Sequence, residues 1–238
     1  MNKKISSNIA LILARKGSKG LPGKNKKIFL GKPLIYWTIK NAIQSKIFSK
    51  VVVSTDCEEI ASLSMTYGAS VPFLRPEYLS QDESNSIDAV LHALRFFEEY
   101  HNLIFKYTTL LEPTSPLREK DDLKNMYSIL LKFEKKFDAI ISLGEMPYHP
   151  IFSKKLLDNN KITPYFGKNI ECRRQELEKA LFPFGVAYMC KTNILKKDLS
   201  FYPENSTGYL IKPYQCVEID TEVDFICAEA LGKNFLKK

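Results

Sequence analysis

This 238-residue sequence lacks the features that would mark it as a membrane, secreted or zinc-binding protein. No apolar run approaches the roughly 20 residues that span a membrane. The basic start leads into a short apolar run that ends at Arg15 without a small-residue cleavage site, so it does not read as a secretory signal. The five cysteines have no C-x-x-C spacing, and the three histidines are not spaced as zinc ligands. We therefore expect a cytoplasmic protein with reduced thiols and no membrane partner.

Nucleic-acid-binding motifs are also missing, although the net charge is +8. The lysines are spread along the chain and form no basic amphipathic helix. A net positive charge also suits anionic small substrates. We favour these over nucleic acid because the most cationic loop follows a strand, where α/β proteins bind small ligands. With 45% hydrophobic residues the chain can bury a sizeable core. No linker or repeat divides it, so residues 1–238 are expected to form one domain.

Apolar segments with the periods of strands and helices alternate along the chain. Strands are predicted at residues 8–14, 50–55, 71–74, 107–111, 139–143 and 186–190, and helices at 34–45, 58–67, 87–94, 121–133 and 220–231. This βαβ repetition predicts an α/β fold, with a doubly wound, mostly parallel sheet sandwiched by helices.

The periodicity breaks between residues 144 and 182, a stretch with three prolines and many aromatic residues. So long an irregular insert is uncommon inside a compact domain unless it has a function. We expect residues 144–182 to form a small protruding arm that packs against a partner.

The loop after the first strand, Arg15-Lys-Gly-Ser-Lys-Gly-Leu-Pro-Gly-Lys-Asn25, is rich in glycine and cations. Glycine lets backbone N–H groups approach a ligand, and Arg15, Lys19 and Lys24 can neutralise its charge. Because ligands of α/β proteins bind at the carboxyl edge of the sheet, the loop suits a polyphosphate, with Ser18 as a further donor. The loop is neither a Walker A nor a G-x-G-x-x-G motif, and a solvated lysine-rich turn is the alternative.

Further segments follow in a recognisable order. They are Ser54-Thr-Asp56, Leu74-Arg-Pro76, residues 82–86, Pro113-Thr-Ser-Pro-Leu-Arg118, Arg174-Gln-Glu-Leu177 and Glu218-Ile-Asp-Thr-Glu222. Together with the cationic loop they resemble the cytidylyltransferases that activate sialic acids, the CMP-acylneuraminate synthetases. The resemblance spans nearly the whole chain.

That resemblance implies a Rossmann-like enzyme that transfers CMP from CTP to the anomeric hydroxyl of a nonulosonic acid and releases pyrophosphate. It assigns Arg15 and Lys24 to the triphosphate and Asn25 to the nucleotide. It gives Arg75 and Ser86 to the cytidine, although Ser86 could equally be a helix cap. It also implies a homodimer, or a higher homo-oligomer, in which the arm of one chain lines the sugar pocket of the other.

Two carboxylates, Glu218 and Asp220, lie on one face of an extended segment because side chains alternate there. Such closely spaced oxygen ligands suit Mg²⁺, which also binds phosphate oxygens. The resembled family carries aspartate at both positions, so we expect Asp220 to be the stronger ligand and a catalytic residue. The alternative is that Asp220 begins the cap of the last helix.

The resemblance places the sugar among four residues. Arg174 would bind the sugar carboxylate, and Glu112, Phe184 and Tyr188 would line the pocket. Sialic acid enzymes carry glutamine where Glu112 stands and asparagine where Phe184 stands. These departures predict a modified nonulosonic acid.

Two other functions stay open from the sequence. One is an eight-carbon sugar cytidylyltransferase of the Kdo type, and the other is a non-catalytic nucleotide- or nucleic-acid-binding protein. The sequence does not reveal a general base, the number of metal ions or the sugar's substituents.

Overall fold

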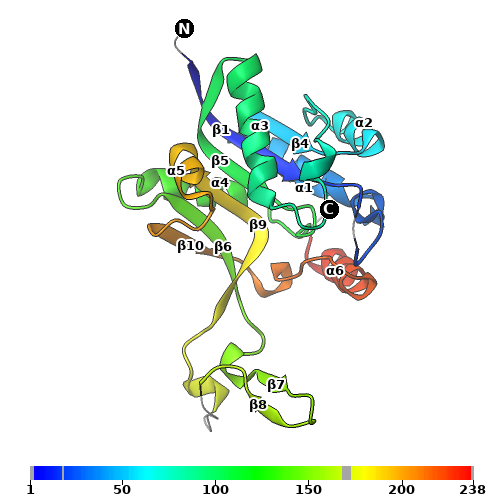
Figure 1. Cartoon of the computed structure of the whole chain (residues 1–238), viewed down its shortest axis with the longest axis vertical. Coiled ribbons are helices and arrows are strands. Elements are labelled where there is room, and N and C mark those ends of the chain that lie inside the picture. The colour runs from blue at the N-terminus through cyan, green and yellow to red at the C-terminus, as the bar shows by residue number, and fades with distance from the viewer. Residues whose placement is uncertain (1–2, 18, 168–172, 237–238) are drawn as a thin grey trace.

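The computed structural model describes residues 3–17, 19–167 and 173–236 (Figure 1). Its centre is a six-stranded sheet in the order β10-β6-β9-β5-β1-β4. The strands are β1 Lys4–Leu13, β4 Lys50–Ser54, β5 Leu103–Leu111, β6 Ala139–Glu145, β9 Leu181–Lys191 and β10 Ser206–Leu210. Strand β9 is antiparallel to both of its neighbours, β5 and β6, and the other pairs are parallel. The α/β fold with a mostly parallel sheet is therefore confirmed.

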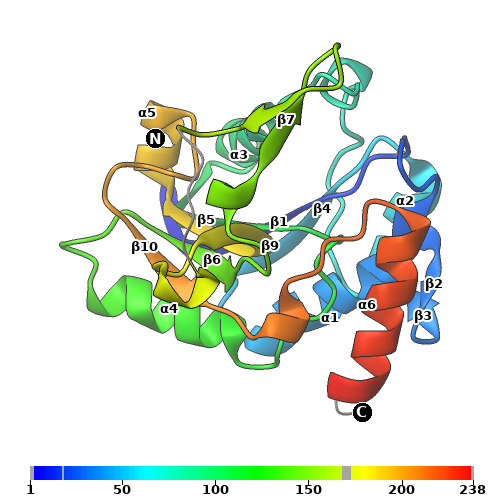
Figure 2. The same cartoon turned by 90° about the horizontal axis from the view of Figure 1, so that it is seen from below.

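Helices cover both faces of this sheet (Figure 2). They are α1 Leu34–Ser45, α2 Glu58–Thr66, α3 Ser86–Tyr100, α4 Asp122–Lys132, α5 Thr192–Asp198 and α6 Glu222–Phe235. Because side chains alternate along β1, Ala10 and Ile12 pack with α1, α2 and α4, whereas Ile9 and Leu11 pack with α3. Both faces of the strand are buried, which explains its continuous apolar run.

A third apolar cluster attaches α6 to the main body. Phe225 and Ala228 of α6 pack with Leu21 of the cationic loop, with Leu117 and with Ile219. The helix starts at Glu222 rather than at the predicted Asp220, because Thr221 is its N-cap and exchanges hydrogen bonds with Asp224. This packing brings residues 219–221 beside a loop that lies 200 positions earlier in the chain.

One strand prediction is wrong, and several short elements were not predicted. Residues 71–74 form no strand; the residue before them, Ser70, makes one isolated bridge with Val52. Pro72 and Pro76 explain this, since proline has no N–H for a ladder. Strand β10 and helix α5 were not predicted, nor were two hairpins, β2 Ile28–Phe29 with β3 Lys32–Pro33 and β7 Lys154–Leu156 with β8 Ile162–Pro164. Short 3₁₀ turns complete the structure at Lys24–Lys26, Glu77–Leu79, Pro150–Phe152, Arg174–Glu176 and Pro213–Gln215.

Strands β6 and β9 continue beyond the body of the protein and carry the β7–β8 hairpin away from it (Figure 1). The described part of this protrusion exposes large apolar side chains, with Tyr148 82%, Leu156 70% and Ile162 65% exposed. In the described ranges, no helix is both long and apolar enough to cross a lipid bilayer.

Candidate active site

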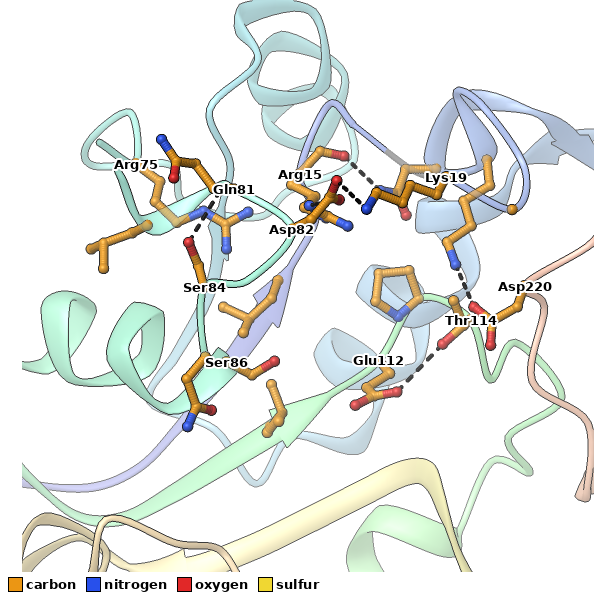
Figure 3. A pocket seen from close by; sticks show the side chains of 18 residues that line it. Arg15, Lys19, Arg75, Gln81, Asp82, Ser84, Ser86, Glu112, Thr114 and Asp220 are labelled. Atoms are coloured by element: carbon orange, nitrogen blue, oxygen red, sulfur yellow. Dashed lines mark hydrogen bonds and ion pairs between the residues drawn. The ribbon is translucent and has the colours of Figure 1, made fainter. Parts of the chain in front are cut away.

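A cavity of about 490 Å³ opens at the carboxyl ends of β1 and β5 (Figure 3). It brings together eight of the residues expected from the sequence, namely Arg15, Lys19, Lys24, Asn25, Arg75, Ser86, Glu112 and Asp220. Ser18 lies outside the described residues. Arg174 begins a 3₁₀ turn in the arm, and its side chain is also outside the described part.

The cationic loop is held in place by tight local packing. Gly23 has φ 68°, a left-handed conformation that favours glycine, and it leads into the 3₁₀ turn that begins at Lys24. A Cβ on Gly20 would collide with the backbone carbonyl of Asp220. Asn25 is buried, and its amide donates to the Arg15 carbonyl at 3.3 Å. The loop therefore closes on itself and against residue 220.

Three of its four cations, Arg15, Lys19 and Lys24, have an acidic partner inside the cavity. Asp82 binds Arg15 at 2.7 Å with one oxygen and Lys19 at 2.8 Å with the other. These bonds, first that from Lys19 and then that from Arg15, hold the pKa of Asp82 below its usual range. Lys24 donates to Asp220 Oδ1 at 2.8 Å and to the Ile219 carbonyl at 3.0 Å. Figure 3 shows Asp82 between the first two cations.

Arg75 lies on another wall of the cavity, near the start of α3. It is 6% exposed, and its backbone N–H donates to the Thr55 carbonyl at 2.7 Å. Within the described residues its Nε and one terminal nitrogen have no hydrogen-bond partner. Burial lowers the pKa of this guanidinium. Buried donors without acceptors are costly, so the geometry suits a ligand that supplies oxygen or ring-nitrogen acceptors.

Ser86 also lines the cavity, as the first residue of α3. The N-cap of this helix is Asn85, whose side chain accepts from the Ile87 backbone N–H at 3.2 Å. The hypothesis that Ser86 caps the helix is therefore wrong, and its hydroxyl is not needed to cap the N-terminus of α3.

Two carboxylates, those of Glu112 and Glu218, lie next to Gly185. Glu218 Oε1 accepts from the Gly185 N–H at 2.7 Å, and Glu112 Oε2 accepts from the Thr114 hydroxyl at 3.4 Å. Burial raises the pKa of both groups, and the neighbouring Glu218 charge raises that of Glu112 further. A Cβ on Gly185 would lie 2.6 Å from Glu112 Oε2, so only glycine leaves room for this arrangement.

The donor set fits a magnesium ion held by one carboxylate. The side chain of Asp220 is 71% exposed at the cavity, whereas Glu218 is used in the hydrogen bond to Gly185. No group of three or more possible metal ligands occurs in the described part of the chain. Magnesium is commonly held by one or two carboxylates, with substrate phosphates and water completing its shell. Asp220 fits that role better than Glu218.

Phe184 and Tyr188 do not line this cavity; they lie on β9 beside Glu112. Tyr188 is 8% exposed, and burial raises its pKa, with the charge of Glu112 adding to the effect. The Phe184 ring packs against Gly144 and lies 5.3 Å from the ring of Phe182.

Sequence reasoning missed the role of Arg118, which is 3% exposed and lies directly beneath Glu112 and Gly185. It was noted only as the end of the Pro113–Arg118 segment. The signal that could have found it is an arginine that directly follows the apolar Leu117 in a loop after a buried strand.

Comparison with known proteins places this geometry in a family. A family model described as "Cytidylyltransferase" matches residues 9–174. Pseudaminic acid cytidylyltransferase of Campylobacter jejuni is 37% identical over 95% of this chain and 96% of its own length. CMP-N,N'-diacetyllegionaminic acid synthase of Legionella pneumophila is 33% identical, over 94% and 95%.

A longer relative also aligns with this chain, and a solved structure shares its fold. N-acylneuraminate cytidylyltransferase of Streptococcus agalactiae is 32% identical over 92% of this chain, which matches 51% of that protein. A CTP complex of CMP:2-keto-3-deoxy-manno-octonic acid synthetase shares the fold, with a TM-score of 0.68, 17% identity and coverage of 96% and 99%. The family model and the relatives together cover nearly the whole sequence, so this chain belongs to the cytidylyltransferase family of nucleotidyltransferases.

Proposed function

We propose that this enzyme transfers CMP from CTP to the anomeric hydroxyl of a nonulosonic acid and releases pyrophosphate. The observation that carries this proposal is that one cavity is lined both by three cations and by a buried guanidinium whose donors have no partner among the described residues. Arg15, Lys19 and Lys24 suit the triphosphate of CTP. Arg75, with Ser86 nearby, suits the acceptors of the cytidine.

In the proposed reaction the anomeric oxygen of the sugar forms a bond to the α-phosphorus of CTP. The bond from that phosphorus to the β-phosphate oxygen breaks, pyrophosphate takes the electron pair, and the hydroxyl proton is lost. The chain's contribution is alignment and neutralisation of charge, since phosphoryl transfer requires little covalent chemistry from protein. Arg15 and Lys24 stabilise the charge that develops on the phosphate oxygens.

Asp220 would hold Mg²⁺ at this position, beside Lys24. When bound, the ion would supply further positive charge to the phosphate oxygens and orient them. Glu218 would support the site by fixing Gly185 rather than by binding the metal.

The sugar would bind between the cavity and the start of β9. We propose that it is a modified nonulosonic acid of the pseudaminic or legionaminic type, since relatives named for both acids align along nearly the whole chain. A carboxylate at position 112 favours a sugar substituent that donates hydrogen bonds, because a buried carboxylate without a donor is costly. The ring of Phe184 suits a deoxy position. Tyr188 and, from the arm, Arg174 would complete the pocket.

The arm, residues 144–182, would pair two chains into a homodimer. Its described apolar side chains have no sheet of their own large enough to cover them, because β7 and β8 form only a two-stranded hairpin.

The test is pyrophosphate release by the purified chain with CTP and Mg²⁺, and with one added acid at a time. The panel contains pseudaminic acid, N,N'-diacetyllegionaminic acid, N-acetylneuraminate and Kdo. We expect a higher kcat/KM for one of the first two than for N-acetylneuraminate. Preference for Kdo would shift the proposal to the eight-carbon substrate, and CTP binding without pyrophosphate release would indicate a non-catalytic binder.

A further inference from the structure

The central sheet opens into a fork at the edge of the site. Strands β5 and β9 pair from Tyr107 with Lys191 to Leu110 with Tyr188. The Glu112 N–H still donates to the Gly185 carbonyl at 3.1 Å, but β5 ends at Leu111, whereas β9 continues along β6, with which it pairs on its other side, as far as Leu181 with Glu145. The carbonyls of Glu112, Gly185 and Val186 lie where β5 and β9 separate, and all three accept hydrogen bonds from Arg118.

The guanidinium of Arg118 lies where the two strands separate. Its Nε–H donates to the Val186 carbonyl at 2.7 Å, and one terminal nitrogen donates to the carbonyls of Glu112 and Gly185 at 2.7 and 2.6 Å. The other terminal nitrogen donates to the Thr38 hydroxyl and the Ser115 carbonyl at 2.8 and 2.6 Å. All five N–H groups of the side chain are therefore used.

Arginine is suited to this position by shape as well as by charge. The planar guanidinium reaches five acceptors at once, whereas a lysine ammonium has three donors. Its hydrogen bonds go to four carbonyls and one hydroxyl, and the negative charges of Glu112, Asp122 and Glu218 lie around it. Burial lowers the pKa of Arg118 to about 10, so the group stays cationic.

These contacts lead to the two carboxylates of the proposed sugar site. Arg118 binds the backbone of Glu112 and of Gly185, and Gly185 in turn donates to Glu218. In contrast, no described hydrogen bond or ion pair joins Arg118 to the cationic loop or to Arg75.

We propose that Arg118 is a positioning residue for the sugar substrate: it holds the fork open and so fixes Glu112 directly, and Glu218 through Gly185. This inference rests on the proposed function. Loss of the fork lets Gly185 and Glu112 shift relative to each other, while the nucleotide half of the cavity keeps its own supports.

The experiment compares Arg118→Met and Arg118→Lys with the unaltered enzyme, using the acid that the panel identifies. A shift of about 1 Å in substrate-positioning groups can cost about 100-fold, so we expect kcat/KM for the sugar to fall about 10- to 100-fold in Arg118→Met. The Kd of CTP, measured by calorimetry, should stay within about 2-fold, and Arg118→Lys should recover part of the loss because it keeps the charge and three donors. Arg95→Met, an exposed arginine on α3, is the matched control and should leave both quantities unchanged.

Several outcomes would overturn the inference. Equal losses in CTP and sugar affinity, or a lower melting temperature with unchanged sugar kinetics, would show a structural role alone. If Arg118→Met does not fold, Thr38→Val removes one acceptor from the guanidinium on the α1 side. It should then raise KM for the sugar more than the Kd of CTP, and the absence of that difference would refute the proposal. An unaltered enzyme that is inactive with every acid would refute the proposed function instead, before any variant is compared.

Discussion

At the scale of single residues, the cavity pairs its cations with carboxylates in two different ways. Lys24 is 16% exposed and is also bound to a backbone carbonyl, so its position is fixed by the fold. Lys19 is 76% exposed and is bound through Asp82. Exposed ion pairs contribute little to stability, so the Asp82 contacts are open to competition from a phosphate.

Replacing Lys24 by methionine removes a charge that the phosphate oxygens would meet. We expect kcat/KM for CTP to fall about 100- to 1,000-fold, because loss of one preorganised donor typically has that cost. The matched control is Lys26→Met, two positions later, where the ammonium pairs with Glu59 and does not line the cavity. Steady-state kinetics that give the same activity for both variants would remove Lys24 from the mechanism.

Comparing the variants Asp220→Asn and Glu218→Gln tests whether Asp220 is the metal ligand and Glu218 only supports the site. Asp220→Asn should raise the Mg²⁺ concentration needed for half-maximal activity and cut turnover by about 100-fold or more, since it removes the exposed carboxylate beside the phosphates. Glu218→Gln should change the Mg²⁺ dependence little. If magnesium titrations show a larger change in Mg²⁺ dependence for Glu218→Gln than for Asp220→Asn, Glu218 is the metal ligand instead.

Asp82→Asn tests whether Asp82 competes with the triphosphate. Both of its oxygens hold cations that CTP would need, so removing its charge should tighten CTP binding by about 2- to 5-fold, the size expected of an exposed pair. Calorimetric titration with CTP measures the change. Weaker binding in the variant would show that Asp82 orders the two cations for the nucleotide instead.

At the scale of elements, the β7–β8 hairpin is a two-stranded sheet separate from the central sheet. The exposed side chains of Leu156 and Ile162 face each other across its register. An isolated two-stranded hairpin is marginally stable in water, so a second chain is a natural cover.

The double variant Leu156→Asp with Ile162→Asp should therefore convert dimers into monomers at micromolar concentration, because buried carboxylates would face the partner. Sedimentation velocity measures the change. The control is Ile226→Asp on α6, where the isoleucine is 60% exposed but lies far along the chain from the arm. A monomeric and fully active unaltered enzyme would contradict the arm's role.

At the scale of the whole molecule, Asp138 and Lys191 join the start of β6 to the end of β9. Lys191 donates to Asp138 at 2.7 Å and to the Glu134 carbonyl at 2.7 Å. The bond from Lys191 lowers the pKa of Asp138 below its ordinary 3.8. A carboxyl with a lowered pKa in the folded state stabilises that state above its unfolded pKa, and this contribution is lost as pH falls through the folded pKa.

Asp138→Asn should accordingly lower the melting temperature by about 2–4 °C at neutral pH, the shift expected for about 1 kcal/mol in a protein of this size. The two melting temperatures should converge as pH falls from neutral through the lowered folded pKa of Asp138, because the carboxyl of the unaltered protein then becomes protonated as well. Calorimetric scans from neutral to acid pH measure whether the difference in melting temperature decreases as expected. A difference that persists unchanged in acid would assign the effect to packing.

Local patterns were sufficient to predict most elements near the core. Helix α1 has the predicted bounds, and β4, α2 and α4 differ by a residue at one or both ends, because burial of an apolar face imposes a period that the sequence carries directly. The apolar residues at 71–74 led to a wrong strand prediction, because Pro72 and Pro76 disfavour a sheet ladder there. Helix α5 has only seven residues, too few for a helical period to be read. Strand β10 is as long as β4 but is a partly exposed edge strand with the sequence Ser-Thr-Gly-Tyr-Leu, so it lacks the apolar run of β4.

The sequence by itself determined the alternation of strands and helices, the cationic loop after the first strand, and the order of segments that indicates the family. Only the tertiary structure decided which charges meet: Asp82 with Arg15 and Lys19, Asp220 with Lys24, and Arg118 with the carbonyls of a forked sheet. These partners lie apart in sequence, by as many as 196 positions for Lys24 and Asp220. Periodicity reports how each segment is buried, whereas the meeting of two distant side chains depends on where the crossovers and the α6 cluster bring their backbones.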